Sequence, residues 1–275
     1  MSDRHVMSCM GMTKVVIENG RVTEVGEPEI RYCPLFKKYR GIDDITAESV
    51  RENIEFRMGS FGMCTESREV RMKDFLAFGV SETLSSALRH DMLDCAVIAA
   101  DGCGTVVVTD PEIVQGLGGR ISGICETSPI RCVINTVGRD NILDPENTSI
   151  DMIKGVDKAI CLGHSRIAVT IAFADDARRI RETYGEAVTI VAVHTSKTSE
   201  EDAKIMFDNC DIITACASVN IREEAKRRDV LVAGKKIPIF GVTPKGQELI
   251  MIRLNEIGKQ PNSTDEFEDL PHPLI

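Results

Sequence analysis

Several features that would reveal a function directly are missing from this chain of 275 residues. It has no long block of Lys or Arg and carries a net charge of −10, whereas proteins that bind the nucleic-acid backbone need a basic surface. No segment approaches the roughly 20 consecutive apolar residues of a membrane span, and the opening residues MSDRHVMSCMGMTK lack the apolar core of an export signal. We therefore expect a cytoplasmic protein that binds neither nucleic acid nor membrane.

The standard nucleotide-binding motifs are missing as well. There is no GxxxxGK(S/T) phosphate loop, and Gly102 and Gly104 lack the third glycine of a dinucleotide fingerprint. Gly116, Gly118 and Gly119 follow a helical turn rather than a strand. These glycines instead predict places where backbone approaches another group closely, or where backbone amides point at an anion.

Cysteine is present in unusual number, with ten residues beside no Trp and three Tyr. A chain of this length without an export signal does not need a disulfide framework, so we predict reduced thiols. We expect Cys95, Cys161 and Cys210 to be buried because they lie in or beside strand-like apolar runs. Cys103 and Cys125 are expected to be at least partly accessible.

The apolar pattern divides the chain into three parts. Residues 1–75 are predicted to form a small α+β lobe with a β-hairpin at Asn19-Gly20 and a helix over residues 46–58. Residues 76–258 alternate apolar runs with helical segments, which predicts an α/β domain with a mostly parallel sheet and helices on both faces. Residues 259–275 are predicted to be an acidic flexible tail or a strap over the surface. The predicted strands of the α/β domain are 95–100, 131–137, 158–163, 166–173, 187–195, 210–218 and 237–242.

The ends of these strands indicate where a ligand binds, because open α/β sheets bind ligands beyond the carboxyl ends of their strands. Hydroxyl, imidazole, thiol and amine groups follow the strands, whereas the strand interiors are aliphatic. Ordinary turns and helix caps produce the same pattern. Ser196 or Thr198 is predicted to cap the helix from residue 199, and Ser218 or Asn220 the helix from residue 221. Thr243 is predicted to cap the segment from residue 245. Such helix starts at a common edge would favour a small anion such as phosphate, sulfonate or carboxylate. The candidate ligand-binding residues are Gly102, Gly104, Gly118, Gly119, Ser165, Ser196, Ser218, Thr243 and Lys245.

Cysteine chemistry offers two further hypotheses. In the first, Cys103 or Cys216 is a catalytic nucleophile, and His164 or His194 from a neighbouring strand end lowers the pKa of the thiol. In the second, thiols from distant loops hold an Fe–S cluster or zinc. The candidate metal ligands are Cys9, Cys33, Cys64 and Cys125. The alternative to both hypotheses is that these cysteines only pack.

Four stretches of the chain resemble the family called methanogenesis marker protein 8: HVMSCMGMTKVVIENGRVTEVG, YCPLFKKYRGI, AADGCGTVVVTDPEIVQGLGGRISG and IPIFGVTPKGQELI. The similarity extends from His5 to about Gly258. It implies an anaerobic archaeal cytoplasm and a connection with methanogenesis, and it assigns no catalytic residue.

Two function hypotheses follow. The resemblance favours an accessory factor in the maturation or maintenance of methyl-coenzyme M reductase or its cofactors, with that enzyme or its maturation proteins as partners. The residues themselves favour an enzyme that acts on a small anionic metabolite in the C-terminal strand-end crevice through a cysteine nucleophile.

Overall fold

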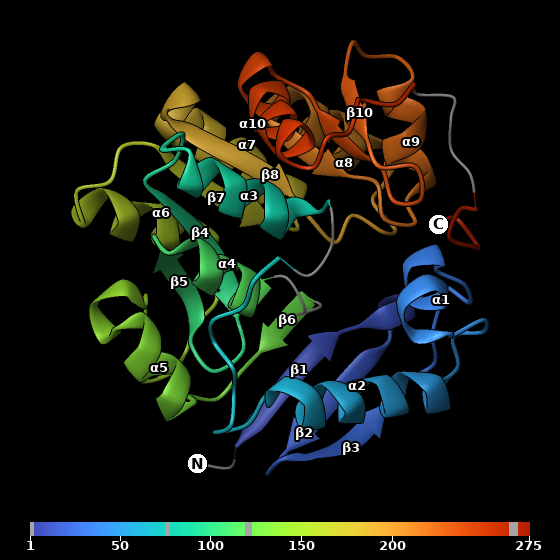
Figure 1. Ribbon diagram of the computed structural model, residues 1–275, viewed down its shortest axis with the longest axis vertical. Helices are drawn as coiled ribbons and strands as arrows, with labels where there is room; N and C mark the ends of the chain where they lie inside the picture. Colours follow the sequence, from blue (N-terminus) through green and yellow to red (C-terminus); the bar gives the residue numbers. More distant parts are fainter. Residues whose placement is uncertain (1–2, 75–77, 119–122, 264–268) are drawn as a thin grey trace.

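Two β-sheets organise the protein. The computed structural model describes residues 3–74, 78–118, 123–263 and 269–275. A four-stranded sheet has the order β3-β2-β1-β6, and a seven-stranded sheet has the order β10-β11-β9-β8-β7-β4-β5. Figure 1 shows the smaller sheet, with α2 against it, below the larger one and its helices.

The N-terminal lobe forms as its sequence indicates. Asn19 and Gly20 have φ values of 49° and 71°, the left-handed pair that a tight hairpin turn requires, so the predicted hairpin is confirmed. Thr46 caps α2, which runs past the predicted end at residue 58 and stops where Gly62 adopts a φ of 72°. The lobe contains β1 (Arg4–Ser8), η1 (Met10–Met12), β2 (Lys14–Glu18), β3 (Arg21–Val25), α1 (Pro34–Arg40) and α2 (Ala47–Phe61).

The sheet of the lobe takes one strand from the second part of the chain. The strand β6 (Gly123–Glu126) pairs with β1 in antiparallel orientation. The side chain of Ile124 joins the apolar core that α2 covers. The lobe is therefore completed by a segment that follows residue 76, and the domain boundary at residue 75 stays a prediction.

The larger sheet is mixed, so the prediction of a mostly parallel sheet is wrong. The pairs β4–β7, β7–β8 and β8–β9 are parallel, whereas β4–β5, β9–β11 and β10–β11 are antiparallel. Gly102 and Gly104, with φ values of 80° and 65°, turn the chain so tightly that β5 folds back on β4 as a hairpin. The strands are β4 (Cys95–Ala100), β5 (Gly104–Val108), β7 (Ile167–Ile171), β8 (Val188–Ala192), β9 (Ile212–Thr214), β10 (Leu231–Ala233) and β11 (Ile239–Gly241).

Helices cover both faces of this sheet, as predicted. One apolar core lies under α3, α4, α5 and α10, and the other lies under α6, α7, α8 and α9. The helices are α3 (Val80–Arg89), α4 (Pro111–Gly118), α5 (Arg131–Val137), η2 (Arg139–Asn141), α6 (Met152–Cys161), α7 (Ala174–Tyr184), η3 (Gly185–Ala187), α8 (Glu200–Asn209), α9 (Val219–Ala225) and α10 (Pro244–Glu256). Among the helices of the described residues, none is both long and apolar enough to cross a membrane.

Two predicted strands are helical. Residues 131–137 form α5, and residues 158–161 form the last turn of α6. Short apolar runs do not distinguish a strand from a buried helix face, since both place aliphatic side chains in the core. As a result Cys161 is exposed rather than buried, and His164 precedes β7 instead of following a strand.

The glycines beside Cys103 serve close packing of the backbone. A Cβ atom on Gly102 would lie 2.5 Å from Cβ of Ile130, and one on Gly104 would lie 2.1 Å from the carbonyl oxygen of Thr148. The space that a ligand would need at these glycines is thus filled by the protein itself. The close-approach interpretation is confirmed, and a role of these glycines in ligand binding stays a prediction.

Candidate functional site

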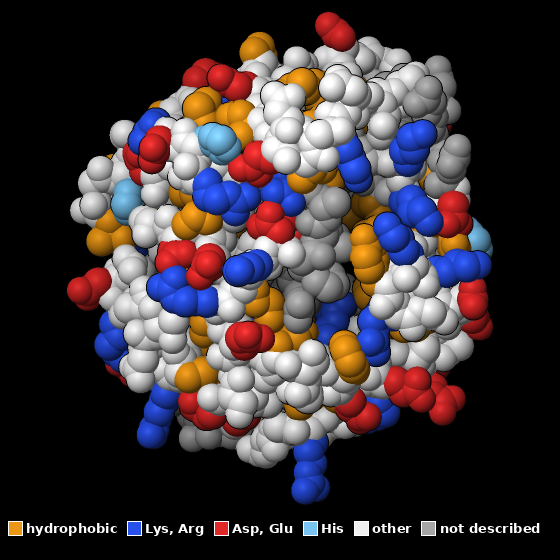
Figure 2. Space-filling view, viewed as in Figure 1, with side chains coloured by type: hydrophobic (Ala, Val, Ile, Leu, Met, Phe, Trp, Pro, Cys, Tyr) orange, Lys and Arg blue, Asp and Glu red, His pale blue; other side chains and the backbone are white. Residues whose placement is uncertain are grey.

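The carboxyl ends of the parallel strands face the N-terminal lobe. Because β4, β7, β8 and β9 are parallel, these ends lie at one side of the sheet, which we call the carboxyl edge. The lobe lies beneath this edge (Figure 1), and the surface is hollowed between the two (Figure 2). An ion pair of 2.6 Å between Lys197, after β8, and Glu29, in the lobe, spans this junction. We call the hollow the recess.

Cys216 stands at the end of β9 in a strained conformation. Its φ is 41°, a left-handed value that costs a non-glycine residue free energy. Its half-buried thiol lies 3.5 Å from Oγ1 of Thr214. Such strain persists only where the surrounding structure imposes it, and it is common at functional sites.

Arg222 brings a buried positive charge to Cys216. It lies on α9 with only 4% of its surface exposed, and its Nη2 donates a 2.8 Å hydrogen bond to the carbonyl oxygen of Cys216. Burial lowers the pKa of Arg222 to about 10, and the attraction of the Cys216 thiolate opposes this shift. The guanidinium thus holds the backbone that carries the Cys216 thiol.

His194 occupies the same position after β8 as Cys216 does after β9. It too is left-handed, with a φ of 56°. A Cβ atom on Gly123 of β6 would lie 3.6 Å from Cγ of its ring, so the ring faces the lobe. His194 is exposed as a residue, but desolvation by the protein around its ring lowers its pKa, which keeps the ring neutral at pH 7. Ser196 links the two strand ends, because its Oγ accepts a 3.2 Å hydrogen bond from the amide of Ala217.

Cys33 reaches the recess from the lobe. This half-buried residue immediately precedes α1. Burial raises the pKa of its thiol, and the nearby Cys216 raises it further, whereas the backbone amides of Phe36 and Leu35 lower it. Cys33 and Cys216 thus interact electrostatically across the recess.

Residues 269–275, which we call the strap, tie the two walls of the recess together. The carbonyl oxygen of His272 accepts hydrogen bonds of 2.9 Å and 3.0 Å from the amides of Arg31 and Tyr32, and the His272 ring stacks on Tyr32. At the other wall, the amide of Ile275 donates a 2.8 Å hydrogen bond to the carbonyl oxygen of Ala217. The flexibility predicted for residues 259–275 stays a prediction.

Cys103 is placed where it cannot meet a substrate. It is fully buried in the apolar core at the β4–β5 turn, and burial raises its pKa far above the ordinary value. The prediction that it is accessible is therefore wrong. The predictions that Cys125 is accessible and that Cys95 and Cys210 are buried are confirmed.

The end of β4 is closed by a buried ion pair. Nε of Arg68 lies 3.0 Å from Oδ2 of Asp101, and both side chains are fully buried. Asp101 also accepts from the amide of Cys64, and Arg68 donates to the carbonyl oxygen of Gly116. Because these partners satisfy the pair, we restrict the candidate site to the ends of β8 and β9.

Four of the predicted site residues lie at the opposite, amino edge of the sheet. His164 and Ser165 precede β7, and both the amide and the hydroxyl of Ser165 bind Asp94. Thr243 caps α10, as predicted. Because β11 is antiparallel to β9, the start of α10 lies at the amino edge of the sheet. There, Nζ of Lys245 lies 3.5 Å from the carbonyl oxygen of Glu186. These four residues therefore cannot join His194 and Cys216 at one ligand.

The other predicted ligand-binding residues have structural surroundings. Ser218 is fully buried and caps α9 with its hydroxyl, as predicted. The helix α8 is capped by Ser199 rather than by Ser196 or Thr198. Gly118 ends α4, and Gly119 lies outside the described residues.

The four cysteines predicted as metal ligands do not form one group. Cys9 and Cys64 are buried, and burial raises the pKa of Cys9 to about 12, which disfavours the thiolate that a metal binds. Cys125 is exposed on β6, and Cys33 lies before α1. Within the part of the chain that the structure describes, no three His, Cys, Asp or Glu side chains are arranged to hold a metal ion. A metal role for these thiols stays a prediction.

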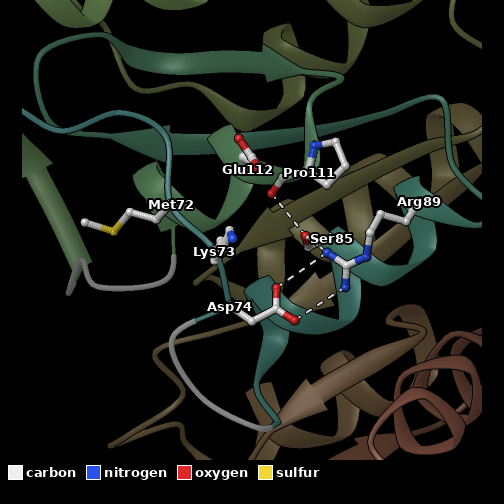
Figure 3. A pocket seen from close by; sticks show the side chains of 7 residues that line it. All are labelled: Met72, Lys73, Asp74, Ser85, Arg89, Pro111 and Glu112. Atoms are coloured by element: carbon white, nitrogen blue, oxygen red, sulfur yellow. Dashed lines mark hydrogen bonds and ion pairs between the residues drawn. The ribbon is translucent and has the colours of Figure 1, made fainter.

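A second concave region lies away from the recess, between α3, α4 and the segment before residue 75 (Figure 3). This cavity has a volume of about 550 Å³. Asp74 forms an ion pair with Arg89. The Ser85 hydroxyl accepts a hydrogen bond from Arg89 and donates one to the carbonyl oxygen of Pro111. These polar groups satisfy one another, so we prefer the recess. The residues that line this second cavity are Met72, Lys73, Asp74, Ser85, Arg89, Pro111 and Glu112.

Sequence reasoning missed Arg222. It follows the buried Ile221 on a short helix and precedes the charged run from Glu223 to Arg228, so it reads as the start of a solvated face. The signal that could have found it is its position four residues after Ser218, which caps the helix. This spacing places Arg222 on the side of the helix that faces the strand end.

The fold and the site define a mixed α/β protein with a thiol and a buried arginine at its strand ends. The chain belongs to an archaeal family, DUF2099, described as uncharacterized proteins conserved in archaea, whose pattern matches residues 5–255. It is 42% identical over 280 residues to the uncharacterized protein MJ0054 of Methanocaldococcus jannaschii, a match that covers 99% of this chain and 100% of that protein. No solved structure matches the chain significantly.

Proposed function

We propose that the protein binds a small anionic metabolite in the recess and that Cys216 is the group that reacts with it. The observation that carries this proposal is the strained, half-buried Cys216 beside the buried guanidinium of Arg222. A buried cation attracts a ligand anion strongly because little water screens it. The local charge matters in a chain of net charge −10, which otherwise repels anions.

His194 and Ser196 have positioning roles in this proposal. A neutral imidazole has one nitrogen that can accept a proton and one that can donate a hydrogen bond. The His194 ring faces the lobe and can therefore contact a ligand that approaches Cys216 from that side. The hydroxyl of Ser196 holds the amide of Ala217, and thereby the backbone next to Cys216. The proposal places this chemistry in a reducing cytoplasm, because all ten cysteines are free thiols.

Calorimetric titration with sulfonated, phosphorylated and carboxylated thiols tests the proposal. Replacing Arg222 with Gln removes a charge-assisted contact, so we expect affinity to fall by about 1.5–3 kcal/mol, roughly 10- to 150-fold. Arg227→Gln is the matched control, since Arg227 is 60% exposed and close to the same helix. Thermal unfolding of each variant separates lost binding from lost structure. Equal affinity of Arg222→Gln and the parent for every anion would contradict the proposal.

A second candidate function is an accessory role in the maturation or maintenance of methyl-coenzyme M reductase or its cofactors. Two observations support it: the resemblance noted in the sequence and the methanogenic source of the 42% identical relative. Anaerobic sedimentation of the protein with purified reductase and with its maturation proteins tests this role. A complex that forms with one of them and not with an unrelated protein of equal charge is expected, and the absence of any complex would contradict it.

A further inference from the structure

The recess contains thiols on both of its walls. Of the ten cysteines, Cys9, Cys64, Cys95, Cys103 and Cys210 are buried, and Cys125 and Cys161 are exposed. The three that remain are half-buried: Cys33, Cys132 and Cys216. Cys132 lies on α5 and bonds the carbonyl oxygen of Arg68, away from the strand ends of β8 and β9. Cys33 and Cys216 are therefore the half-buried pair at the recess.

We propose that Cys33 and Cys216 act as a dithiol pair that exchanges with small anionic disulfides. This inference rests on the proposed anion site and names the class of its substrate. It assigns the protein a redox activity in which the N-terminal lobe supplies one reactive group and the α/β domain supplies the other.

The strap bridges the chain neighbours of the two thiols. Tyr32, the neighbour of Cys33, binds the backbone of His272, and Ala217, the neighbour of Cys216, binds the backbone of Ile275. A stretch of four residues spans at most about 14 Å even when fully extended. The two cysteines thus flank opposite ends of one short segment, which agrees with the electrostatic interaction between their thiols.

The surroundings of the two thiols assign different roles to them. Cys216 is the attacking group, because Arg222 lies beside it and its strained backbone holds it at the strand end. Cys33 is the resolving group. Burial disfavours its thiolate, so it remains protonated until a mixed disulfide brings its target close, and the resolving step should accelerate as pH rises.

The atoms and electrons of the exchange balance without a metal and without an oxidant other than the ligand disulfide. The Cys216 thiolate attacks one sulfur of a disulfide RS–SR′, and R′S⁻ leaves with the electron pair of the broken bond. Cys33 then loses its proton to water and attacks the sulfur of Cys216, which releases RS⁻ and forms the Cys33–Cys216 disulfide. The ligand disulfide is reduced to two thiols, the protein dithiol is oxidised, and a low-molecular-weight thiol reduces the protein again.

Anaerobic titration with 5,5′-dithiobis(2-nitrobenzoate), an anionic disulfide, tests the pair. The titrated protein carries Ser at positions 125, 132 and 161, so that Cys33 and Cys216 are its remaining thiols outside the core. We expect release of about two equivalents of thionitrobenzoate per chain, no retained adduct, and a Cys33–Cys216 peptide link in the mass spectrum. A stable thionitrobenzoate adduct on Cys216 with no such link would overturn the inference.

Two single variants assign the order of attack. Cys33→Ser should release about one equivalent and retain the adduct on Cys216, because nothing resolves it. Cys216→Ser should react at least about tenfold more slowly, since the remaining thiol is the one with the raised pKa. Fast reaction of Cys216→Ser with a retained adduct on Cys33 would reverse the assigned roles and contradict the proposal as stated.

A neutral disulfide separates this inference from the anion site. Arg222→Gln should slow the reaction with the anionic reagent about tenfold more than it slows the reaction with 4,4′-dithiodipyridine, because only the anionic reagent loses its attraction to the guanidinium. Failure of the link to form in a protein that still binds anionic thiols through Arg222 overturns the dithiol pair alone. A link that forms equally fast with both reagents, and equally in Arg222→Gln, overturns the anion specificity of the proposed function and keeps the pair.

Discussion

The two edges of the seven-stranded sheet differ in how their polar groups are used. At the amino edge, Asp94 accepts hydrogen bonds from the amides of Ser165 and Arg166 and from the Arg166 side chain. Asp211 is fully buried and accepts from Arg181 and the amide of Ile190, while Thr243 donates to its other oxygen. Each carboxylate is matched by fixed donors, which is the pattern of a stabilising contact.

At the carboxyl edge, the same sheet presents strained backbone and reactive groups. His194 and Cys216 both have positive φ, and Cys216 lies beside the guanidinium of Arg222. Strain and a buried cation next to a thiol reduce stability unless other contacts compensate for them. The comparison teaches that satisfied charges mark structural positions, at the amino edge and also at Asp101 after β4, whereas strained residues with accessible reactive groups mark the ends of β8 and β9.

The largest expected effect concerns thiol protection. Under native conditions Cys103 should react with iodoacetamide more than about 10³-fold more slowly than Cys125, because a core thiol becomes accessible only when the protein unfolds. Peptide mapping of labelled protein over time measures both rates. Comparable rates would show that the β4–β5 turn opens easily and would break the assignment of Cys103 to the core.

Removing the buried carboxylate of Asp211 should reduce stability most among single substitutions at the amino edge. Asp211→Ala removes the carboxylate that pairs with Nη2 of Arg181, a side chain only 14% exposed, and that accepts from the amide of Ile190, at a cost of about 3–5 kcal/mol. Denaturant unfolding measures the change. Asp175→Ala is the control, since its exposed pair with Arg178 contributes less than about 1 kcal/mol. Similar losses in both variants would contradict the contrast between buried and exposed pairs.

Acid should weaken the amino edge through Asp94. The Arg166 side chain, with the amides of Arg166 and Ser165, lowers the pKa of Asp94 below its ordinary value of 3.8. A lowered folded pKa contributes stability that is present above pH 3.8 and is lost as pH falls below it. Asp94→Asn should cost about 2 kcal/mol at pH 7 and flatten the loss of stability between pH 4 and pH 2. An unchanged acid slope in this variant would assign the sensitivity to other carboxylates.

The smallest expected effect is at Lys245. Because it lies at the amino edge, Lys245→Ala should change the affinity for anionic thiols by less than about 0.5 kcal/mol, in contrast to Arg222→Gln. The same calorimetric titration measures both variants. A tenfold loss in Lys245→Ala would place anion binding at the amino edge and invert the comparison.

Local signals in the sequence were sufficient for the turn, the caps and most strands. Asn19-Gly20 predicts its hairpin because only such residues adopt two successive left-handed conformations at low cost. Ser218 and Thr243 cap the helices that follow them, since a hydroxyl satisfies amides within three residues. Where apolar runs are short, as at residues 131–137, pattern alone does not separate strand from helix, and the prediction was wrong there.

The candidate site was only partly predictable. Cys216 and His194 follow buried strands, and that position is visible in the sequence. Lys245 also follows a strand, but the direction of β11 depends on which strand it pairs with, and no local signal encodes that choice. The roles of Cys33 and Arg222 depend on the approach of the lobe and of α9 to the strand ends, which are distant in sequence.

The sequence by itself determined the class of most long elements, the hairpin, the helix caps at Ser218 and Thr243 and the presence of two helix-covered faces, because these depend on periodicity and on contacts within a few residues. The tertiary structure alone decided which strands are antiparallel, which edge each strand end reaches, and that Cys103 is buried while Cys216 is only half-buried. The physical reason is that pairing and burial depend on contacts between distant segments, and identical local residues are compatible with several such arrangements.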